Sequence, residues 1–270
     1  MKIFYLIGDS IDKSLSQYIH QWIYQFLNVN ADYNNKNIDT SDFDIKISSI
    51  LSDIELVTID GINITNPYKI KIINSDIILS KHAKRINAIN CIYHDNYLIG
   101  DNTDWVGFLK SIDYNQINLK EYNIKIIGSG GAARAIVYSL QKLGINNFTI
   151  YNRTKTELII NEVIYKTLGL DEFNNINLEN IFLINCIHSS AIDNIINKLD
   201  LNSIGYFYDL NYHKSKLHNI LRSKDIKVIV GLDMLIYQAI KSVEIWFDYE
   251  FSNQINIKEI KTYLKKKALC

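Results

Sequence analysis

The stretch that most constrains the fold runs from Asn123 to Thr154, in the middle of a chain of 270 residues. It begins with a short apolar run, Ile124 to Ile127, typical of a buried strand, and continues through the turn Gly128-Ser129-Gly130-Gly131. An Ala-rich segment of helical periodicity follows up to Leu143, and a second apolar run, Phe148 to Tyr151, predicts the next strand. This order of strand, glycine turn, helix and strand is typical of a dinucleotide-binding unit.

The glycine turn predicts contacts with the phosphate groups of a cofactor. Glycines let the backbone approach a pyrophosphate, and the helix N-terminus offers amide donors and the positive end of its dipole. We therefore expect Gly128, Ser129, Gly130, Gly131 and Ala132 to contact the cofactor. The alternative is a turn that joins two buried elements and binds nothing.

The end of the second strand indicates which dinucleotide is bound. Units that bind NAD usually carry an Asp or Glu there, which holds the ribose 2′-hydroxyl. This chain has Asn152, Arg153, Thr154 and Lys155 instead. Because a guanidinium and an ammonium attract a 2′-phosphate, these residues favour NADP over NAD. A solvated Arg153 without a ligand is the alternative.

Composition argues against several classes of protein. Hydrophobic residues make up 47% of the chain and charged residues 21%, as in folded globular proteins rather than disordered ones. Lys+Arg and Asp+Glu both number 29, so no net charge draws the chain to nucleic acid or to a membrane surface. We expect neither a signal peptide nor a membrane span.

Cysteine and histidine usage indicates a cytoplasmic protein without a metal site. Cys91, Cys186 and Cys270 are odd in number and lack metal-type spacing, which is usual for reduced thiols of the cytoplasm. None of the 6 His residues is paired at a metal-binding spacing.

Apolar patterning predicts alternating strands and helices on both sides of the glycine turn. The expected strands are Lys2–Gly8, Val29–Ile38, Gly61–Thr65, Ala88–Tyr93, Tyr97–Gly100, Ile181–Asn185, Gly205–Asn211 and Ile226–Val230. The expected helices are Gln17–Leu27, Asp42–Leu51, Ile70–Arg85, Trp105–Ile117, residues 155–168, a long helix opening at Gly231, and Lys258–Lys267. Such alternation predicts an α/β fold in which ligands bind at the carboxyl ends of parallel strands.

Two short stretches of the first half combine polar residues with element boundaries. Ser14 and Ser16 stand just ahead of a helix, where serines are ordinary N-caps. Asn66 and Pro67 resemble the N-cap and first position of a helix, which places Lys69 in its first turn. The dipole disfavours a cation there and should ease the loss of its proton, which suits proton transfer. A surface lysine is the alternative.

Taken together, these stretches resemble one family, shikimate dehydrogenase, across essentially the whole chain. Its signatures recur in order: Ser14-x-Ser16, Asn63–Lys69, Asn87–Asn90, Asp101–Asp104, Gly128–Arg134, Asn152–Thr154, Tyr208–Tyr212 and Gly231–Gln238. Each motif alone is weak, but their common order and compatible spacing are specific.

The resemblance implies two α/β domains. Residues 1–104 and 239–270 would form the substrate domain, and residues 105–238 a Rossmann-type, doubly wound NADP domain. The implied reaction is the NADP-dependent reversible reduction of 3-dehydroshikimate to shikimate, a step toward chorismate and the aromatic amino acids. We expect a small-molecule substrate as partner, neither nucleic acid nor membrane, and a monomer or homodimer.

The resemblance also implies the role of each site residue. Lys69 and Asp104 would be the proton-transfer pair at the carbonyl being reduced. Substrate contacts would come from the hydroxyls of Ser14, Ser16 and Tyr212 at the carboxylate, and from Thr65, Asn90, Asp104 and Gln238 at the ring hydroxyls. Leu210 and Gly231 would border the nicotinamide.

The chain departs from the family pattern at Lys13, Gln17, Trp105, Glu157, Cys186–Ser189 and Asp233. Glu157 replaces a second cation that many members direct at the 2′-phosphate. The preference for NADP would then rest on Arg153, with help from Lys155. Trp105 replaces a usual glycine at the hinge between the domains.

Two other functions stay open. An NAD-tolerant quinate/shikimate dehydrogenase would be favoured by an acidic residue directly after Arg153, where this chain has Thr154. A nucleotide-binding regulator that has lost catalysis would lack Lys69 or Asp104, and both are present.

Overall fold

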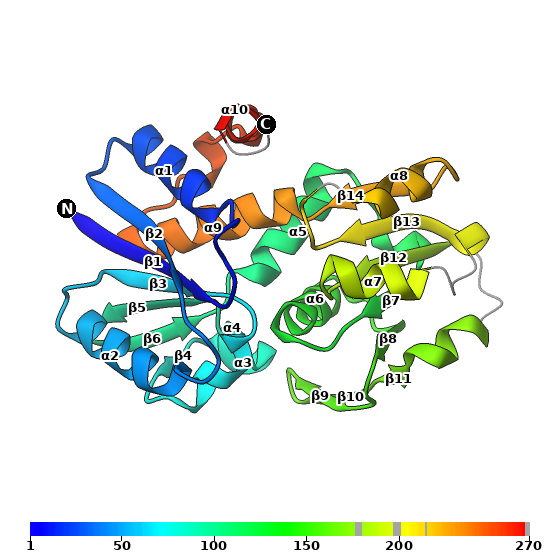
Figure 1. Ribbon diagram of the computed structural model, residues 1–270, viewed down its shortest axis with the longest axis horizontal. Helices are drawn as coiled ribbons and strands as arrows, with labels where there is room; N and C mark the ends of the chain where they lie inside the picture. The colour runs from blue at the N-terminus through cyan, green and yellow to red at the C-terminus, as the bar shows by residue number, and fades with distance from the viewer. Residues whose placement is uncertain (176–179, 197–200, 214, 268–270) are drawn as a thin grey trace. The chain divides into compact units, whose positions relative to one another are not determined.

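The computed structural model describes residues 1–175, 180–196, 201–213 and 215–267. The chain divides into two compact units: the first comprises Met1–Gly107 and Leu235–Cys270, and the second Phe108–Met234. Figure 1 shows each unit as strands and helices together, so the predicted α/β class is confirmed. The unit boundaries differ by a few residues from the expected domains, and Gln238 belongs to the first unit.

The first unit is built on a six-stranded mixed sheet with the order β2-β1-β3-β5-β6-β4. The strands are β1 (Lys2–Gly8), β2 (Ala31–Asn37), β3 (Gly61–Ile64), β4 (Ile78–Leu79), β5 (Cys91–Asp95) and β6 (Tyr97–Asp101). β1 lies parallel to β2 and β3, whereas β5 is antiparallel to β3 and β6. The predicted hairpin between β5 and β6 turns at Asn96, whose φ is 57°.

Aromatic side chains pack helices on both faces of this sheet. The helices are α1 (Ser16–Leu27), α2 (Phe43–Glu55), α3 (Tyr68–Lys71), α4 (Lys81–Ile86), α9 (Leu232–Phe247) and α10 (Ile257–Lys267). Phe4 of β1 stacks on Trp246 of α9 with ring centroids 4.4 Å apart. Phe43 of α2 stacks on Tyr68 of α3 at 4.0 Å, within the core that includes Ile62 of β3.

The stretch Ile70–Arg85, expected to be mostly helical, is helical only in parts. The chain forms α3, a 3₁₀ turn η1 (Ile72–Asn74), the strand β4, and then α4, which Ser80 caps by accepting a hydrogen bond from Ala83 N at 3.1 Å. β4 pairs with β6 at the sheet edge, and Leu79 packs on the core. Packing and strand pairing therefore override the helical pattern here.

The second unit contains a six-stranded, fully parallel sheet with the order β11-β8-β7-β12-β13-β14. The strands are β7 (Asn123–Ile127), β8 (Phe148–Asn152), β11 (Leu168–Gly169), β12 (Ile181–Asn185), β13 (Ile204–Asp209) and β14 (Lys227–Val230). Counted within the sheet, this is the Rossmann order 3-2-1-4-5-6. The order reverses between β7 and β12, the switch point where such sheets bind ligands.

Helices flank this second sheet. They are α5 (Asp104–Tyr114), α6 (Gly131–Lys142), α7 (Ser189–Ile196) and α8 (Lys216–Arg222), with the 3₁₀ turns η2 (Leu119–Glu121), η3 (Leu170–Asn175) and η4 (Leu201–Ser203). Leu217 of α8 and Ile192 of α7 share one core with Phe207 of β13. Phe108 of α5 packs on Tyr208, which points to the opposite face of that strand.

The helix predicted over residues 155–168 is wrong. This stretch forms an antiparallel hairpin of β9 (Glu157–Ile160) and β10 (Val163–Lys166). Asn161 and Glu162 form its two-residue turn, with φ of 50° and 68°. Two β-branched runs separated by two residues, the first of them Asn, are a hairpin signal that we did not weigh against helical length.

The hairpin packs against α6. Leu158 and Ile160 are fully buried and alternate with exposed residues, which is the period of a strand. Gln141 of α6 donates from Nε2 to Tyr165 Oη at 2.7 Å. The hairpin thus lies in the crossover from β8 to β11, where a parallel sheet usually has a helix.

Candidate active site

Lys69 and Asp104 form an ion pair within the first unit. Lys69 lies in α3, just after β3, and Asp104 is the first residue of α5. Lys69 Nζ lies 2.5 Å from Asp104 Oδ2, and the two side chains are 15% and 5% exposed. The N-terminus of α5 favours a carboxylate, because the positive end of the helix dipole lies there. An ammonium and a carboxylate in such contact can share a proton with a bound substrate.

The predicted helix start before Lys69 is wrong in its details. Pro67, not Asn66, is the N-cap residue, no side chain caps the helix, and the Asn66–Pro67 peptide bond is cis. Because α3 spans only four residues, its first turn is also its last, and Lys69 lies in both. The argument from the helix dipole therefore fails, and a role for Lys69 rests on its contact with Asp104.

Asn90 holds the Asp104 carboxylate on its other oxygen. Asn90 Oδ1 accepts a hydrogen bond from Thr103 N at 2.7 Å, which fixes the orientation of the amide. Asn90 Nδ2 then donates to Asp104 Oδ1 at 2.9 Å and to Gln238 Oε1 at 3.3 Å. Lys69, Asp104, Asn90 and Gln238 are thus brought together in one unit.

Other buried polar residues, to which we had assigned no role, support this cluster. Asn63 Nδ2 donates to the carbonyl of Asn90 at 2.9 Å and to Ser242 Oγ at 3.0 Å. Asn102 Oδ1 accepts from the backbone amide of Asp104 at 3.0 Å. An asparagine inside an otherwise apolar strand such as β3 was the available signal, because a buried amide needs partners.

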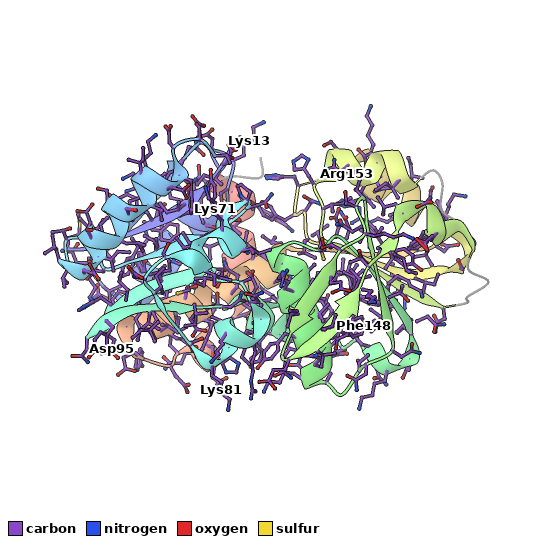
Figure 2. The ribbon with its side chains drawn as sticks, turned by 90° about the horizontal axis from the view of Figure 1, so that it is seen from below. Lys13, Lys71, Lys81, Asp95, Phe148 and Arg153 are labelled. Atoms are coloured by element: carbon purple, nitrogen blue, oxygen red, sulfur yellow. The ribbon has the colours of Figure 1, made fainter. Side chains whose placement is uncertain are left out.

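Ser14 and Ser16 are not helix caps. α1 begins at Ser16, and its N-cap residue is Leu15, which offers no side-chain hydrogen bond. Ser14 Oγ donates to Ser16 Oγ at 3.2 Å and accepts from Ser16 N at 3.3 Å. The capping alternative is therefore wrong for both serines. Lys13 is exposed beside them (Figure 2), and Thr65 follows directly after β3.

The glycine turn lies at the carboxyl end of β7, at the switch point of the second sheet. Gly128 has a φ of 109°, and a Cβ added there would approach Ile187 Cγ2 to 2.9 Å. No atom lies within 4 Å of a Cβ added at Gly130, and α6 begins with Gly131. This open turn before a helix N-terminus suits the phosphates of a dinucleotide.

Of the two basic residues that follow β8, one is unpaired among the described residues and the other forms an ion pair. Arg153 is exposed (Figure 2) and forms no hydrogen bond or ion pair with any other described residue. Lys155 Nζ lies 2.6 Å from Glu172 Oε2, a hydrogen bond that raises the pKa of the lysine and lowers that of the glutamate. Glu157 pairs with Lys166 across the hairpin at 3.6 Å. The ammonium of Lys155 is thus already paired with a carboxylate.

Asn152 and Thr154 complete this strand end. Asn152 Nδ2 donates to the carbonyl of Thr154 at 2.9 Å. This bond spans Arg153, which is exposed.

Leu210 and Gly231 lie against each other in the second unit. A Cβ added at Gly231 would lie 2.3 Å from the Leu210 carbonyl oxygen, so only glycine allows this approach. Tyr212 follows two residues later, and its ring lies 4.6 Å from that of His213.

The departures at Trp105 and Asp233 both have defined partners. The Trp105 ring stacks on His82 of α4 with centroids 4.6 Å apart. Asp233 Oδ2 accepts a hydrogen bond from Asn115 Nδ2 at 3.1 Å. Each replacement is thus accommodated by contacts within its own unit.

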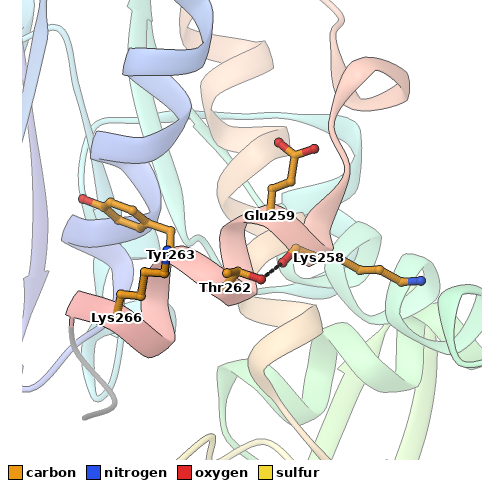
Figure 3. A pocket seen from close by; sticks show the side chains of 5 residues that line it. All are labelled: Lys258, Glu259, Thr262, Tyr263 and Lys266. Carbon is orange, nitrogen blue, oxygen red and sulfur yellow. Dashed lines mark hydrogen bonds between the residues drawn. The ribbon is translucent and has the colours of Figure 1, made fainter.

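The described residues hold neither a metal cluster nor a membrane-spanning helix. No group of three or more His, Cys, Asp or Glu side chains there could hold a metal ion. No helix in the same residues is long and apolar enough to cross a membrane. A hollow of about 360 Å³ on α10 is lined by Lys258, Glu259, Thr262, Tyr263 and Lys266 (Figure 3), none of which is a predicted site residue.

Known proteins with similar sequences share one description. The family model for the shikimate dehydrogenase substrate binding domain matches residues 6–92. A shikimate dehydrogenase (NADP(+)) of Caldicellulosiruptor bescii is 33% identical over 92% of this chain and 90% of its own. Its counterpart from Caldicellulosiruptor saccharolyticus is 32% identical over 99% of this chain and 100% of its own. The chain belongs to the shikimate dehydrogenase family.

Solved structures agree with this family membership. Shikimate dehydrogenase 1 from Peptoclostridium difficile superposes with a TM-score of 0.82 at 28% identity, covering 100% of this chain and 98% of that one. A shikimate dehydrogenase solved in complex with NADP+ gives a TM-score of 0.78 at 28% identity over 99% and 96% of the two chains. The predicted family and the predicted Rossmann-type fold are both confirmed.

Proposed function

We propose that this shikimate dehydrogenase family member catalyses the NADP-dependent, reversible reduction of 3-dehydroshikimate to shikimate, in the biosynthesis of chorismate and aromatic amino acids. The observation that carries the proposal is the Lys69–Asp104 pair, 2.5 Å apart and held by Asn90. The names of relatives that match nearly the whole chain, shikimate dehydrogenase (NADP(+)), support the same reaction and cofactor.

The proton-transfer step falls to Lys69. Its ammonium donates to the oxygen of the carbonyl under reduction and polarises the developing alkoxide. Asp104, bound to Lys69 through Oδ2 and to Asn90 through Oδ1, keeps the ammonium in place. Because Asp104 is nearly buried, water competes little for this pair. General acid catalysis of this kind contributes about 10²–10⁴-fold to the rate.

The remaining substrate contacts are hydroxyl and amide groups. Ser14, Ser16 and Tyr212 are proposed to bind the substrate carboxylate, and Thr65, Asn90, Asp104 and Gln238 its ring hydroxyls. The adjacency of Asn90, Asp104 and Gln238 in one hydrogen-bonded cluster supports the second group. The paired hydroxyls of Ser14 and Ser16 support the first.

NADPH supplies the hydride when bound. The open turn Gly128–Ala132 fits its pyrophosphate through backbone amides. Arg153 is proposed to hold the 2′-phosphate, with Asn152, Thr154 and Lys155 around it. Leu210 and Gly231 are proposed to border the nicotinamide. The first unit would accordingly be the substrate domain and the second the NADP domain.

Assembly and location complete the proposal. We expect a monomer or homodimer in the cytoplasm, with no nucleic-acid or membrane partner. Cys91 and Cys186 are free thiols, which supports a reducing compartment.

The direct test is a spectrophotometric assay of the purified chain. Shikimate or quinate is offered with NADP+ or NAD+, and the absorbance of reduced nicotinamide is followed. We expect shikimate with NADP+ to give the highest kcat/KM. Equal use of quinate and NAD+ would replace the proposal by a quinate/shikimate dehydrogenase, and no turnover at all would favour a regulator.

A further inference from the structure

The carboxylate of Asp209 is the centre of a buried polar cluster outside the residues assigned above. Asp209 ends β13 and is 1% exposed. Its Oδ1 accepts hydrogen bonds from Asn185 Nδ2 at 2.9 Å, from Asn211 Nδ2 at 2.7 Å and from Asn211 N at 3.0 Å. Its Oδ2 lies 2.7 Å from His218 Nε2.

A buried carboxylate destabilises the folded state unless its oxygens accept hydrogen bonds. The donors around Asp209 are therefore needed to keep this charge inside the protein. His218 is 2% exposed and lies in α8, whose N-cap is the hydroxyl of Ser215. The cluster therefore joins the carboxyl ends of the neighbouring strands β12 and β13 to α8, the next helix along the chain.

The residues held by this cluster are those that face the proposed cofactor site. Leu210 lies between Asp209 and Asn211, and its amide donates to Asn185 O at 3.0 Å. Asn211 Nδ2 also donates to the carbonyl of Ile187 at 2.9 Å. Ile187 in turn packs beside the glycine turn, since its Cγ2 would lie 2.9 Å from a Cβ added at Gly128.

We propose that Asp209 and His218 are positioning residues for hydride transfer, an inference that rests on the proposed function. His218 anchors the Asp209 carboxylate to α8, and the carboxylate fixes Leu210 against Gly231 through Asn211. Leu210, which the proposed function places beside the nicotinamide, is thereby held in one position within the second unit. Displacement of a reacting group by about 1 Å costs about 10²-fold in rate.

A role in stability alone predicts a different result, and Ser215→Ala is the matched control. That change removes the cap of α8, which accepts a hydrogen bond from the backbone amide of His218, and deletes none of the side chains that donate to Asp209. His218→Ala removes the anchor, and His218→Gln restores a donor where Nε2 lies. Each protein is assayed for kcat, for the KM of NADPH and for the isotope effect with NADPH deuterated at the transferred position.

We expect His218→Ala to lower kcat by about 10- to 100-fold and to raise the isotope effect, because hydride transfer becomes slower than the other steps. His218→Gln should recover kcat to within about threefold of wild type, and Ser215→Ala should keep both the wild-type kcat and isotope effect. If His218→Ala matches Ser215→Ala in kcat and isotope effect, the inference is wrong, whatever the change in melting temperature.

Two further measurements keep the test decisive. If His218→Ala does not fold, Asn211→Ala takes its place, because it removes both hydrogen bonds of one half-buried side-chain amide and should lower kcat about tenfold. If the wild-type chain does not turn over shikimate, the proposed function fails. The inference is then judged by the fluorescence of bound NADPH, which His218→Ala should alter and Ser215→Ala should not.

Discussion

The two units prepare their proposed sites in opposite ways. In the first unit, Lys69, Asp104 and Asn90 are fixed to one another by hydrogen bonds among largely buried side chains. In the second unit, Arg153 is exposed and pairs with no other described residue. The first arrangement sets a geometry before any ligand binds, whereas the second offers a charge that a ligand can reach.

This difference separates two kinds of effect. Removing a member of the fixed cluster should slow the chemical step, because its interactions are realised in the transition state. Removing an exposed cation should weaken binding of the cofactor that carries the matching phosphate and leave turnover at saturation nearly intact.

The largest effect is expected for Lys69→Ala. Loss of the proton donor should lower kcat by about 10²–10⁴-fold and leave NADP+ affinity largely unchanged. Steady-state kinetics and a fluorescence titration with NADPH measure the two quantities. Lys71→Ala is the matched control, since Lys71 lies in the same helix and pairs with the exposed Asp44. If the Lys69→Ala enzyme keeps a kcat within a few-fold of wild type, Lys69 is not the proton donor.

The double change Ser14→Ala with Ser16→Ala tests the substrate contacts of the first unit. Loss of hydroxyl donors to the substrate carboxylate should raise the KM of shikimate about ten- to a hundredfold and spare the KM of NADP+. Lys13 can retain part of the carboxylate's charge, which is why both serines are changed together. Ser80→Ala is the control, because Ser80 is a true N-cap and its loss should lower the melting temperature without changing KM. An unchanged shikimate KM would return the serines to a structural role.

Arg153→Ala tests the exposed cation of the second unit. Loss of a charge-assisted contact with the 2′-phosphate should weaken NADP+ about ten- to a hundredfold and hardly change NAD+ affinity. Lys166→Ala, a basic residue of the nearby hairpin, serves as control. Equal weakening of both cofactors would mean that Arg153 is structural.

The smallest effect is expected for Glu172→Gln. Glu172 engages Lys155 at 2.6 Å, so its neutralisation should free the ammonium for the 2′-phosphate. NADP+ affinity should rise by about two- to fivefold, as exposed ion pairs are weak, while NAD+ affinity stays constant. Glu157→Gln, which releases Lys166 instead, is the comparison. A rise shared by both cofactors would show a general loss of negative charge.

Local signals predicted the elements in which strand, turn and helix patterns agree. β7, α6 and β8 lie within a residue or two of their expected bounds, and Gly144 follows α6 with a φ of 72°. The stretches 70–85 and 155–168 were misassigned because long-range packing decides them. The hairpin is buried by α6, and β4 is held by β6. The pairing of β4 has no trace in the local pattern, whereas the β-branched runs on either side of Asn161 and Glu162 are a local signal for the hairpin.

The sequence motifs predicted which residues belong to the candidate site. They did not predict which of these residues contact one another. Lys69 and Asp104 are 35 residues apart, so their pairing came from the family resemblance. Asn63 and Ser242, separated by 179 residues, meet only because α9 returns to the first unit. Asp209 and His218 were assigned no role, because only the folded chain brings the end of β13 against α8.

The central claim is that Lys69 and Asp104 act as one proton-transfer unit, and a double-mutant cycle on kcat tests it most directly. Lys69→Ala, Asp104→Asn and the double variant are compared with wild type under saturating shikimate and NADP+. If the pair acts as a unit, the double variant loses no more than the worse single variant, within about threefold. If the two losses multiply instead, the residues act independently and the account is contradicted.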